Sequence, residues 1–340
     1  MEKYIEKYME KYIAIDNVCA WPNLTLLPDG VIIAAIYNQP CHGTWEGELE
    51  CWCSSDDGYL WRRRGVIAAH EPATGRVNFA VCLAHDGALV ALVSGYGPVP
   101  PQAQQAQQRD PNRPGDFLTN WVCRSTDGGY TWDRAETLTL PADITQVIPF
   151  GDIDRSADGA LSTTAYSWNK GEANQLYLLR SQDDGYTWTT NTLIGANDYN
   201  ECALLCLGGP HWLAAARTLQ DQHLELFVST DGGQSWRRGG PLTLPRQHPG
   251  HLLRLSDGRI LLTYGIRNRG FYGVGARLSA DQGATWGAPI VLVDLEDASD
   301  GGYPSSVQLG DATIVTAYYA NRIRAHRRYH MGVVRWQADG

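Results

Sequence analysis

The sequence predicts an all-β protein, a single β-propeller with six blades that extends over residues 13–340. Two internal repeats predict this class: a Ser-x-Asp-x-Gly-x-x-Trp motif that occurs five times, and a strand–turn–strand pattern that occurs six times. Repeated units of about 50 residues with four short strands have the size of one propeller blade. The composition, 43% hydrophobic and 19% charged, is globular and excludes a disordered chain or a coiled coil.

The first repeat, which we call the Asp box, is typical of a tight turn between two strands. Its Asp side chain can bond nearby backbone, and its Gly can adopt a positive φ. Its Trp provides a large ring that packs against neighbouring hairpins. Because a turn is needed in each blade and an active site only once, we expect the boxes to be structural. The five copies are Ser54–Trp61, Ser125–Trp132, Ser181–Trp188, Ser229–Trp236 and Ser279–Trp286.

The second repeat precedes each box and predicts the two inner strands of a blade. Six such hairpins with five boxes predict six blades, the last without a box. The last blade is expected to close with the strand HMGVVRWQ and with the segment IAIDNVCAW near residue 15. The turn positions of the six hairpins are 30, 87, 159, 209, 258 and 312.

Charge and cysteine content exclude several classes of protein. Acidic residues outnumber basic ones by 37 to 28, a net charge of -9, so we expect no nucleic-acid partner. No apolar run reaches the roughly 20 residues of a membrane-spanning helix, so we expect no membrane partner. The eight cysteines lack the spacing of a zinc site or a disulfide framework, which favours reduced thiols and a cytoplasmic location. Residues 1–12 repeat a charged unit, lack the apolar core of a secretory signal and are interpreted as an N-terminal extension.

The propeller geometry predicts where a functional site lies. If the hairpin turns lie on one face, residues seven to nine positions before or after each turn surround the channel on the opposite face. Polar and ionisable side chains occupy many of these positions, as expected for a site. They are Trp21–Asn23, Asn78, Asp152, Glu201, Gly250–His251 and Tyr303 before the turns, and Tyr37–Gln39, Ser94–Tyr96, Tyr166–Trp168, Arg217, Gly265–Arg267 and Tyr319–Asn321 after them.

These residues and the Asp boxes resemble the sialidase (neuraminidase) superfamily over nearly the whole chain. The resemblance rests most specifically on NECALLCLGGPHWLAAART, which contains Glu201 and Arg217, and on DGGYPSSVQLGDATIVTAYY, which contains Tyr303. It implies an arginine in the fifth blade, for which Arg267 fits better than Arg269. It also implies a retaining exo-glycosidase that releases a terminal sialic acid or a related acidic sugar, with a glycan or sialoside as the partner.

The chemistry of such a substrate explains the residue types. A carboxylate beside the anomeric carbon repels a carboxylate nucleophile, whereas a tyrosine hydroxyl is neutral until a nearby glutamate takes its proton. Tyr303 and Glu201 would form this pair, and the guanidinium groups of Arg217 and Arg267 would bind the substrate carboxylate. This mechanism needs no metal and implies no cofactor.

Two features depart from the family pattern. The stretch CAWPNLTLLPDG has Cys19, Ala20 and Trp21 where the family has its first arginine. The family's catalytic aspartic acid in the blade-one loop has no counterpart in YNQPCHGTWEGELECW. In that loop we expect Glu46 to be the general acid, with Glu48 as the second choice. Glu50 lies nearby, and His42 is expected to contact substrate.

Further candidates complete the predicted substrate-binding set, and two rival functions stay open. The basic run NRIRAHRRYH, residues 321–330, favours an anionic ligand, and Arg322 in it could replace the missing arginine. The insert at residues 96–117 is expected on the site face. The rivals are a glycosidase or polysaccharide lyase with another substrate, and a non-catalytic glycan-binding propeller. The remaining substrate-binding candidates are Asn78, Asp152 and His251.

Overall fold

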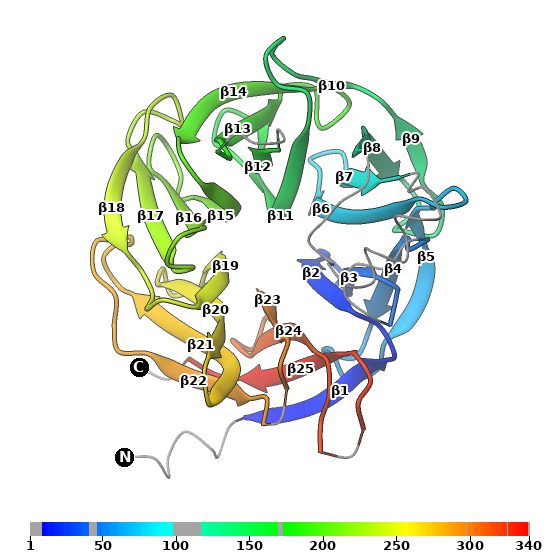
Figure 1. Ribbon diagram of the computed structural model, residues 1–340, viewed down its shortest axis with the longest axis vertical. Helices are drawn as coiled ribbons and strands as arrows, with labels where there is room; N and C mark the ends of the chain where they lie inside the picture. Colours follow the sequence, from blue (N-terminus) through cyan, green and yellow to red (C-terminus); the bar gives the residue numbers. More distant parts are fainter. Residues whose placement is uncertain are drawn as a thin grey trace.

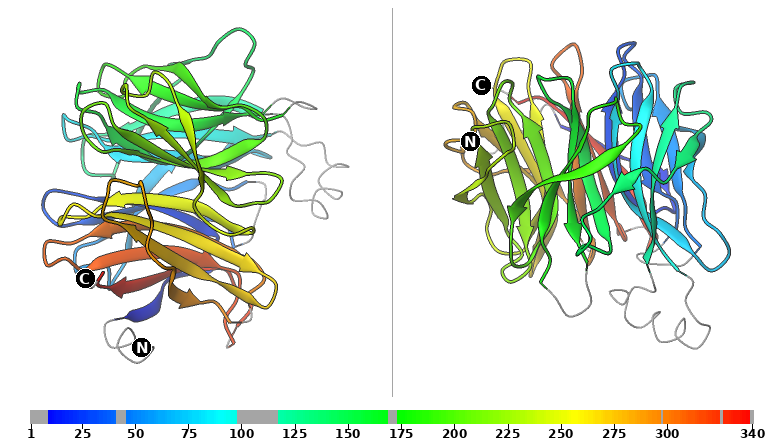
Figure 2. Two further views of the ribbon diagram at one scale, coloured as in Figure 1. Left: turned by 90° about the vertical axis from the view of Figure 1, so that its left-hand side faces the viewer. Right: turned by 90° about the horizontal axis from the view of Figure 1, so that it is seen from above.

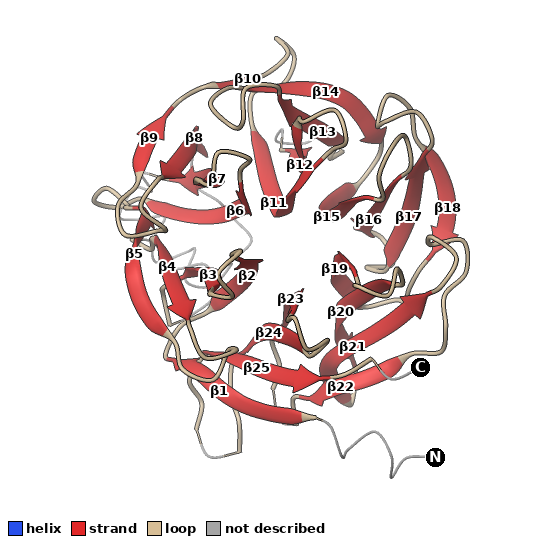
Figure 3. Ribbon diagram, turned by 180° about the vertical axis from the view of Figure 1, so that it is seen from behind, coloured by secondary structure: helices blue, strands red, loops and turns tan. Residues whose placement is uncertain are grey.

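The protein is a ring of short β-sheets whose first strands face a common centre, as Figure 1 shows. We call this centre the channel. The computed structural model describes residues 9–40, 46–97, 117–168, 173–296, 298–324 and 326–338. In these ranges the secondary structure consists of strands and turns without a helix, as Figure 3 shows from the opposite side. The predicted class, an all-β propeller, is confirmed. Figure 2 shows the ring edge-on, with the sheets side by side.

The strands pair in groups of four, from the channel outward. Three groups are β2 (Ala20–Leu26), β3 (Ile32–Tyr37), β4 (Leu49–Ser54) and β5 (Arg62–Ala68); β15 (Tyr199–Cys206), β16 (Trp212–Thr218), β17 (Leu224–Ser229) and β18 (Arg237–Pro241); and β19 (Gln247–Arg254), β20 (Ile260–Asn268), β21 (Phe271–Ser279) and β22 (Ile290–Asp294). The last sheet is β23 (Gly301–Gln308), β24 (Ile314–Ala320), β25 (His330–Trp336) and β1 (Glu10–Asp16).

The remaining strands form one nine-stranded sheet that contains two such groups. A short parallel contact between β6 and β11, at Gly151 with Ala80 and Asp152 with Val81, joins the groups at the channel. We number the blades in chain order, with β2–β5 as blade one and the β23 sheet as blade six. The two groups are β6 (Gly75–Leu83), β7 (Leu89–Tyr96), β8 (Phe117–Ser125) and β9 (Asp133–Ala135), and β11 (Val147–Arg155), β12 (Leu161–Ser167), β13 (Leu176–Ser181) and β14 (Trp188–Gly195) with β10 (Leu138–Thr139) at its edge.

The N-terminal strand closes the ring. Strand β1 pairs antiparallel with β25, from Glu10 opposite Arg335 to Asp16 opposite His330. The outer strand of blade six therefore comes from the start of the chain, as expected. In the other blades an Asp-box turn connects the third strand to the fourth, whereas in blade six no such turn follows β25 in the described residues. This explains why the sixth Asp box is missing. The strand begins at Glu10, so the propeller starts there and not at residue 13.

The Asp boxes are turn-forming elements with a shared set of hydrogen bonds. In the fourth copy Ser229 Oγ donates to Asp231 Oδ1 at 2.8 Å, and the amide of Gly233 donates to Ser229 Oγ at 2.9 Å. The Ser–Asp bond recurs in all five copies. Each box follows the third strand of its blade, which ends on the face where the first strand also ends. The boxes therefore lie on the face away from Tyr303, which is near the start of β23.

Several cysteines in the part of the chain that the structure describes lie on strands of blades one, two and four. Cys51, Cys53, Cys82, Cys123 and Cys206 carry free thiols. The described residues contain no cluster of three metal-ligating side chains and no helix that could span a membrane. The cytoplasmic location stays a prediction.

The first strand of each blade has a bulge, and the bulge of β11 lies nearer to its hairpin turn than the other five. In β2, β6, β15, β19 and β23 two residues lie opposite one residue of the neighbouring strand, and in β11 three residues do. A β-bulge turns the side chains of the extra residues away from the regular alternation. The bulged residues are Trp21–Pro22, Val77–Asn78, Gly151–Ile153, Asn200–Glu201, His248–Pro249 and Tyr303–Pro304.

The hydrogen bonds of the Asp boxes predict how stability responds to acid. Bonds from Ser235 and Ser229 lower the pKa of Asp231 to about 2. A pKa lowered by folding contributes stability that is complete above the pKa of the unfolded chain, near 4, and that is lost as the pH falls toward 2. Asp231→Asn should therefore lower the melting temperature at pH 7, and the difference from the parent should shrink between pH 4 and pH 2. A difference that stays constant down to pH 2 would show that the carboxylate charge is unimportant.

Candidate active site

A buried group of three hydrogen-bonded side chains, which we call the relay, lies at the end of the channel where the sequence predicts the site. It consists of Tyr303 from blade six and of Glu201 and Arg217 from blade four. The Tyr303 hydroxyl donates a hydrogen bond to Glu201 Oε1. Arg217 Nη1 donates to Glu201 Oε2 at 2.7 Å, and the Glu201 side chain is only 7% exposed. The carboxylate therefore receives a neutral hydroxyl on one oxygen and a guanidinium on the other. The residues that the sequence predicted as a pair are brought together.

The bulges explain how these side chains come to meet. Glu201 is the second bulged residue of β15, and Arg217 is the residue of β16 opposite that bulge. Tyr303 is the first bulged residue of β23 and has a positive φ of 49°. A bulky residue in the left-handed region is rare and costs conformational energy, which the surrounding structure must offset. Such strain is concentrated at functional sites, so it agrees with a functional role for Tyr303.

Aromatic rings and one arginine surround the Tyr303 ring. Its centroid lies 5.9 Å from that of Phe150 and 6.3 Å from that of Trp21. Tyr319 is 5.6 Å away in an edge-on arrangement. The guanidinium carbon of Arg267 lies 5.2 Å from the centroid, within the range of a cation–π contact. The ring is thus fixed on several sides while its hydroxyl faces Glu201.

Arg267, and not Arg269, is the arginine that blade five contributes. Arg267 donates from Nη2 to the Tyr319 hydroxyl at 2.9 Å and lies 3.6 Å from Asp300 Oδ1. The alternative, Arg269, is exposed in the turn between β20 and β21. Asp300 also accepts the hydroxyl of Tyr329 at 2.9 Å. Arg267 is therefore held by a carboxylate of its own, as Arg217 is held by Glu201.

Burial and charge together keep Tyr303 protonated in the free protein. Burial raises the pKa of Tyr303 well above 10, and the negative charge of Glu201 adds to this effect. Arg217 and Arg267 oppose it. Burial disfavours the charge of Arg217, but the Glu201 carboxylate holds the pKa of this arginine above its ordinary value. The site therefore has a neutral phenol next to a carboxylate that is ready to accept its proton.

Blades two and three add polar groups next to this relay. Asn78 Oδ1 accepts a hydrogen bond from the Tyr96 hydroxyl at 3.1 Å. Burial raises the pKa values of Tyr96 and Tyr166, and the charge of nearby Glu201 contributes to both shifts. Asn78, which was predicted to bind substrate, therefore belongs to the same end of the channel as Glu201.

Asp152 and His251 lie in a different arrangement from the one expected. Asp152 accepts from Asn23 Nδ2 at 2.6 Å, and its other oxygen lies 2.8 Å from His251 Nε2. Asn23 and His251 follow the bulged residues of β2 and β19, so this trio bridges blades one, three and five deeper in the channel. Both predicted substrate-binding residues are thus engaged with each other beneath the site.

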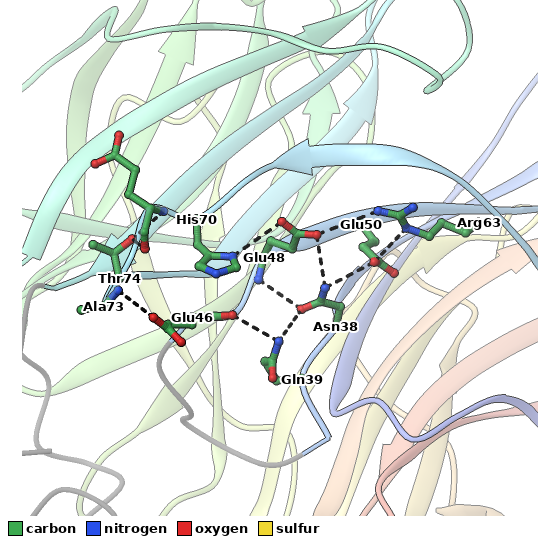
Figure 4. Close-up of polar contacts among 10 residues, drawn as sticks. Asn38, Gln39, Glu46, Glu48, Glu50, Arg63, His70, Ala73 and Thr74 are labelled. Carbon is green, nitrogen blue, oxygen red and sulfur yellow. Dashed lines mark hydrogen bonds and ion pairs between the residues drawn. The ribbon is translucent and has the colours of Figure 1, made fainter. Parts of the chain in front are cut away.

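The blade-one loop carries a separate polar cluster, shown in Figure 4. Glu46 is exposed and accepts the amide of Ala73 at 3.0 Å. Glu48 lies 3.6 Å from His70 Nδ1 and 3.9 Å from Arg63. Among the described residues, no contact joins either glutamate to Tyr303. The structure therefore does not bring the two expected general acids into the relay.

Two other residues of this loop, Glu50 and His42, were also candidates. Glu50 is buried and accepts Arg63 Nε and the Trp52 indole, each at 2.8 Å, so it acts within blade one. His42 lies outside the described residues, as does most of the insert at residues 96–117.

The basic run near the C-terminus does not replace a missing arginine in the relay. Arg322 donates to Ser299 Oγ at 2.9 Å, and Arg324 pairs with Glu296 at 3.1 Å. Arg328 forms an ion pair with Asp16 on β1. Among the described residues, none of these arginines contacts Glu201 or Tyr303.

His248 is the clearest site residue that sequence reasoning missed. It is 1% exposed, and neither ring nitrogen has a hydrogen-bond partner within the described part of the chain. Burial lowers its pKa to about 2, and the positive charges of Arg217 and Arg267 contribute. His248 is therefore neutral and adds no charge to the site. A signal was available, because His248–Pro249 repeats the aromatic–proline pattern of Tyr303–Pro304.

Comparisons with known proteins identify the family to which this chain belongs. A family model described as "BNR repeat-like domain" matches residues 70–316. A sialidase of Micromonospora viridifaciens is 27% identical over 246 residues, which are 67% of this chain and 37% of that protein. The chain therefore belongs to the BNR repeat-like domain family.

Solved structures share the fold at low sequence identity. A protein of unknown function from Dyadobacter fermentans matches with a TM-score of 0.80 and 23% identity, over 96% of this chain and 98% of that one. Trypanosoma rangeli sialidase, solved with 2,3-difluorosialic acid as a covalent intermediate, matches with a TM-score of 0.69 and 15% identity, over 95% of this chain and 54% of that one. The chain spans little more than half of that sialidase.

Proposed function

We propose that the protein is a retaining exo-glycosidase of the sialidase type, which releases a terminal sialic acid or a related acidic sugar. The observation that carries this proposal is the hydrogen bond from the Tyr303 hydroxyl to Glu201, backed by Arg217. A tyrosine whose proton can pass directly to a buried carboxylate is an activated nucleophile. The covalent intermediate in Trypanosoma rangeli sialidase supports the same class of reaction.

The reaction consists of two displacements at the anomeric carbon. In the first, the Tyr303 oxygen forms a bond to this carbon, its proton passes to Glu201, and the bond to the leaving oxygen breaks. The leaving oxygen takes a proton from a general acid. In the second, water attacks the same carbon and gives a proton to the conjugate base of that acid, while the Tyr303 oxygen departs and recovers its proton from Glu201. Two inversions give overall retention of configuration.

The charges of the site favour an acidic sugar. A carboxylate on the anomeric carbon would repel a carboxylate nucleophile but not a neutral phenol, and burial keeps Tyr303 neutral until it reacts. Arg217 and Arg267 provide guanidinium groups on two sides of the Tyr303–Glu201 pair, and guanidinium groups bind carboxylates in two-pronged geometry.

One observation favours a second candidate, a glycosidase or polysaccharide lyase with another substrate. Trp21, and not a guanidinium, stands next to Tyr303 on the blade-one side. A panel of aryl glycosides of sialic acids, uronic acids and neutral sugars separates the two candidates by the sugar that is released. If no aryl glycoside of the panel is cleaved, the remaining candidate is a non-catalytic glycan-binding propeller.

The first prediction from this proposal concerns Tyr303 and Glu201 as one unit. Tyr303→Phe and Glu201→Gln should each lower kcat for the best aryl glycoside by about 10³-fold, which is about 4 kcal/mol of transition-state stabilisation. The double variant should lose at most about tenfold more, because groups that act together are non-additive. Trp286→Phe, at an Asp box on the other face, is the control. Additive losses in the double variant would contradict a shared role.

The second prediction concerns the general acid, for which we propose Glu46 and, as second choice, Glu48. An aryl leaving group departs with little help, whereas an alkyl alcohol needs a proton. Glu46→Gln should therefore reduce kcat/KM about 100-fold for alkyl glycosides and less than about fivefold for aryl glycosides. The same pattern in Glu48→Gln alone would move the role to Glu48. Equal losses on both substrate types in both variants would exclude the two residues as acids.

A further inference from the structure

Trp21 is a partly exposed aromatic residue beside the proposed nucleophile. Its ring stacks on Tyr37 with centroids 5.0 Å apart and an interplanar angle of 17°. Tyr37 and Tyr319, which both contact Trp21, are completely buried, whereas Trp21 keeps part of its surface exposed. Within this aromatic group, solvent and ligands therefore reach Trp21 and Tyr303, and the other two rings support them from behind.

Trp21 is held in the same unusual backbone conformation as Tyr303. Each is the first bulged residue of an innermost strand, each precedes a proline, and their φ values are 45° and 49°. In the neighbouring blade-five strand the equivalent residue, His248, is fully buried and has no positive φ. Strain of this kind at a bulky side chain is maintained where the direction of that side chain matters. The shared geometry directs the Trp21 and Tyr303 rings toward the same part of the channel, 6.3 Å apart.

The charges near Tyr303 are balanced before any ligand binds. Arg217 pairs with Glu201 at 2.7 Å, and Arg267 lies 3.6 Å from Asp300. Two guanidinium groups thus face two carboxylates, and a bound sugar acid adds one more negative charge. Electrostatic attraction for an acid is correspondingly limited, so affinity must come in part from contacts that do not depend on charge.

We propose that Trp21 is a specificity-determining residue that packs against an apolar part of the bound sugar next to its anomeric carbon. This inference rests on the proposed function only for the position of the anomeric carbon at the Tyr303 hydroxyl. A methylene group in this place buries apolar surface against the indole. A hydroxyl group there would be desolvated against the ring without a partner, which is unfavourable. The site therefore selects acidic sugars that have a deoxy carbon beside the anomeric centre over hexuronic acids, which have a hydroxyl there.

The test measures binding apart from turnover. In a Tyr303→Phe background, isothermal titration calorimetry gives the dissociation constants of N-acetylneuraminic acid, which has the methylene, and of glucuronic acid, which has the hydroxyl. Trp21→Leu removes the aromatic ring, and Trp21→Phe keeps one. Trp286→Leu, the same substitution at a half-buried Asp-box tryptophan on the opposite face, is the matched control. Melting curves identify any variant that fails to fold.

We expect N-acetylneuraminic acid to bind more tightly than glucuronic acid, and Trp21→Leu to weaken its binding about tenfold, the effect of losing one stacked ring. Trp21→Phe should lose less than about threefold, and glucuronic acid should be affected little by either change. Three results would overturn the inference. They are equally weakened binding of both acids, unchanged binding in a folded Trp21→Leu protein, and binding of neither acid. Trp21-dependent binding without cleavage of an aryl sialoside by the parent chain would instead overturn the proposed function and leave the inference standing.

Discussion

The arrangement of the site depends on one backbone feature, the bulge in the first strand of each blade. A regular innermost strand would alternate its side chains between the two faces of its own sheet and would pack against the neighbouring blades. The extra residue breaks this alternation and directs side chains into the channel. Glu201 and Tyr303 stand on two such bulges, and Arg217 lies opposite one of them. Closure by β1 and the repeated Asp-box turns fix the blades, so the bulged residues of separate blades stay within contact distance.

The chemistry of the site follows from this convergence of buried groups. A carboxylate with 7% exposure is tolerated because Arg217 and the Tyr303 hydroxyl satisfy both of its oxygens. The same burial raises the pKa of Tyr303, so the phenol is protonated in the free protein, and in the proposed reaction Glu201 would accept its proton. The positive φ of Tyr303 is a local cost that the rings of Phe150, Trp21 and Tyr319 help to offset by packing around it.

The sequence predicts the repeated elements of the fold and the residues that lie a few positions from a repeat. The Asp boxes and hairpin turns predicted the propeller, and counting from the turns brought Glu201, Arg217 and Tyr303 to one place. Counting could not predict which channel residues pair with each other, so it did not predict the contact between Asp152 of blade three and His251 of blade five. Their role in substrate binding stays a prediction. Counting also missed His248, because this residue lies ten positions before the turn glycine Gly258, outside the window of seven to nine positions that selected His251. The choice of Glu46 and Glu48 follows from their positions along the blade-one loop, near its crown and near the start of a strand, which contain no information about the distance to Tyr303.

The central claim, that Tyr303 is the nucleophile, is tested most directly by trapping the covalent intermediate. The protein is incubated with 2,3-difluorosialic acid, whose C2 fluorine leaves as fluoride in the first displacement and whose C3 fluorine slows the second. The product is analysed by intact-mass and peptide mass spectrometry. The account predicts one added sugar per chain, attached to the peptide that contains Tyr303 and absent from a Tyr303→Phe variant. A sugar attached to another residue, or an unlabelled chain that nevertheless cleaves sialosides with retention, would contradict it.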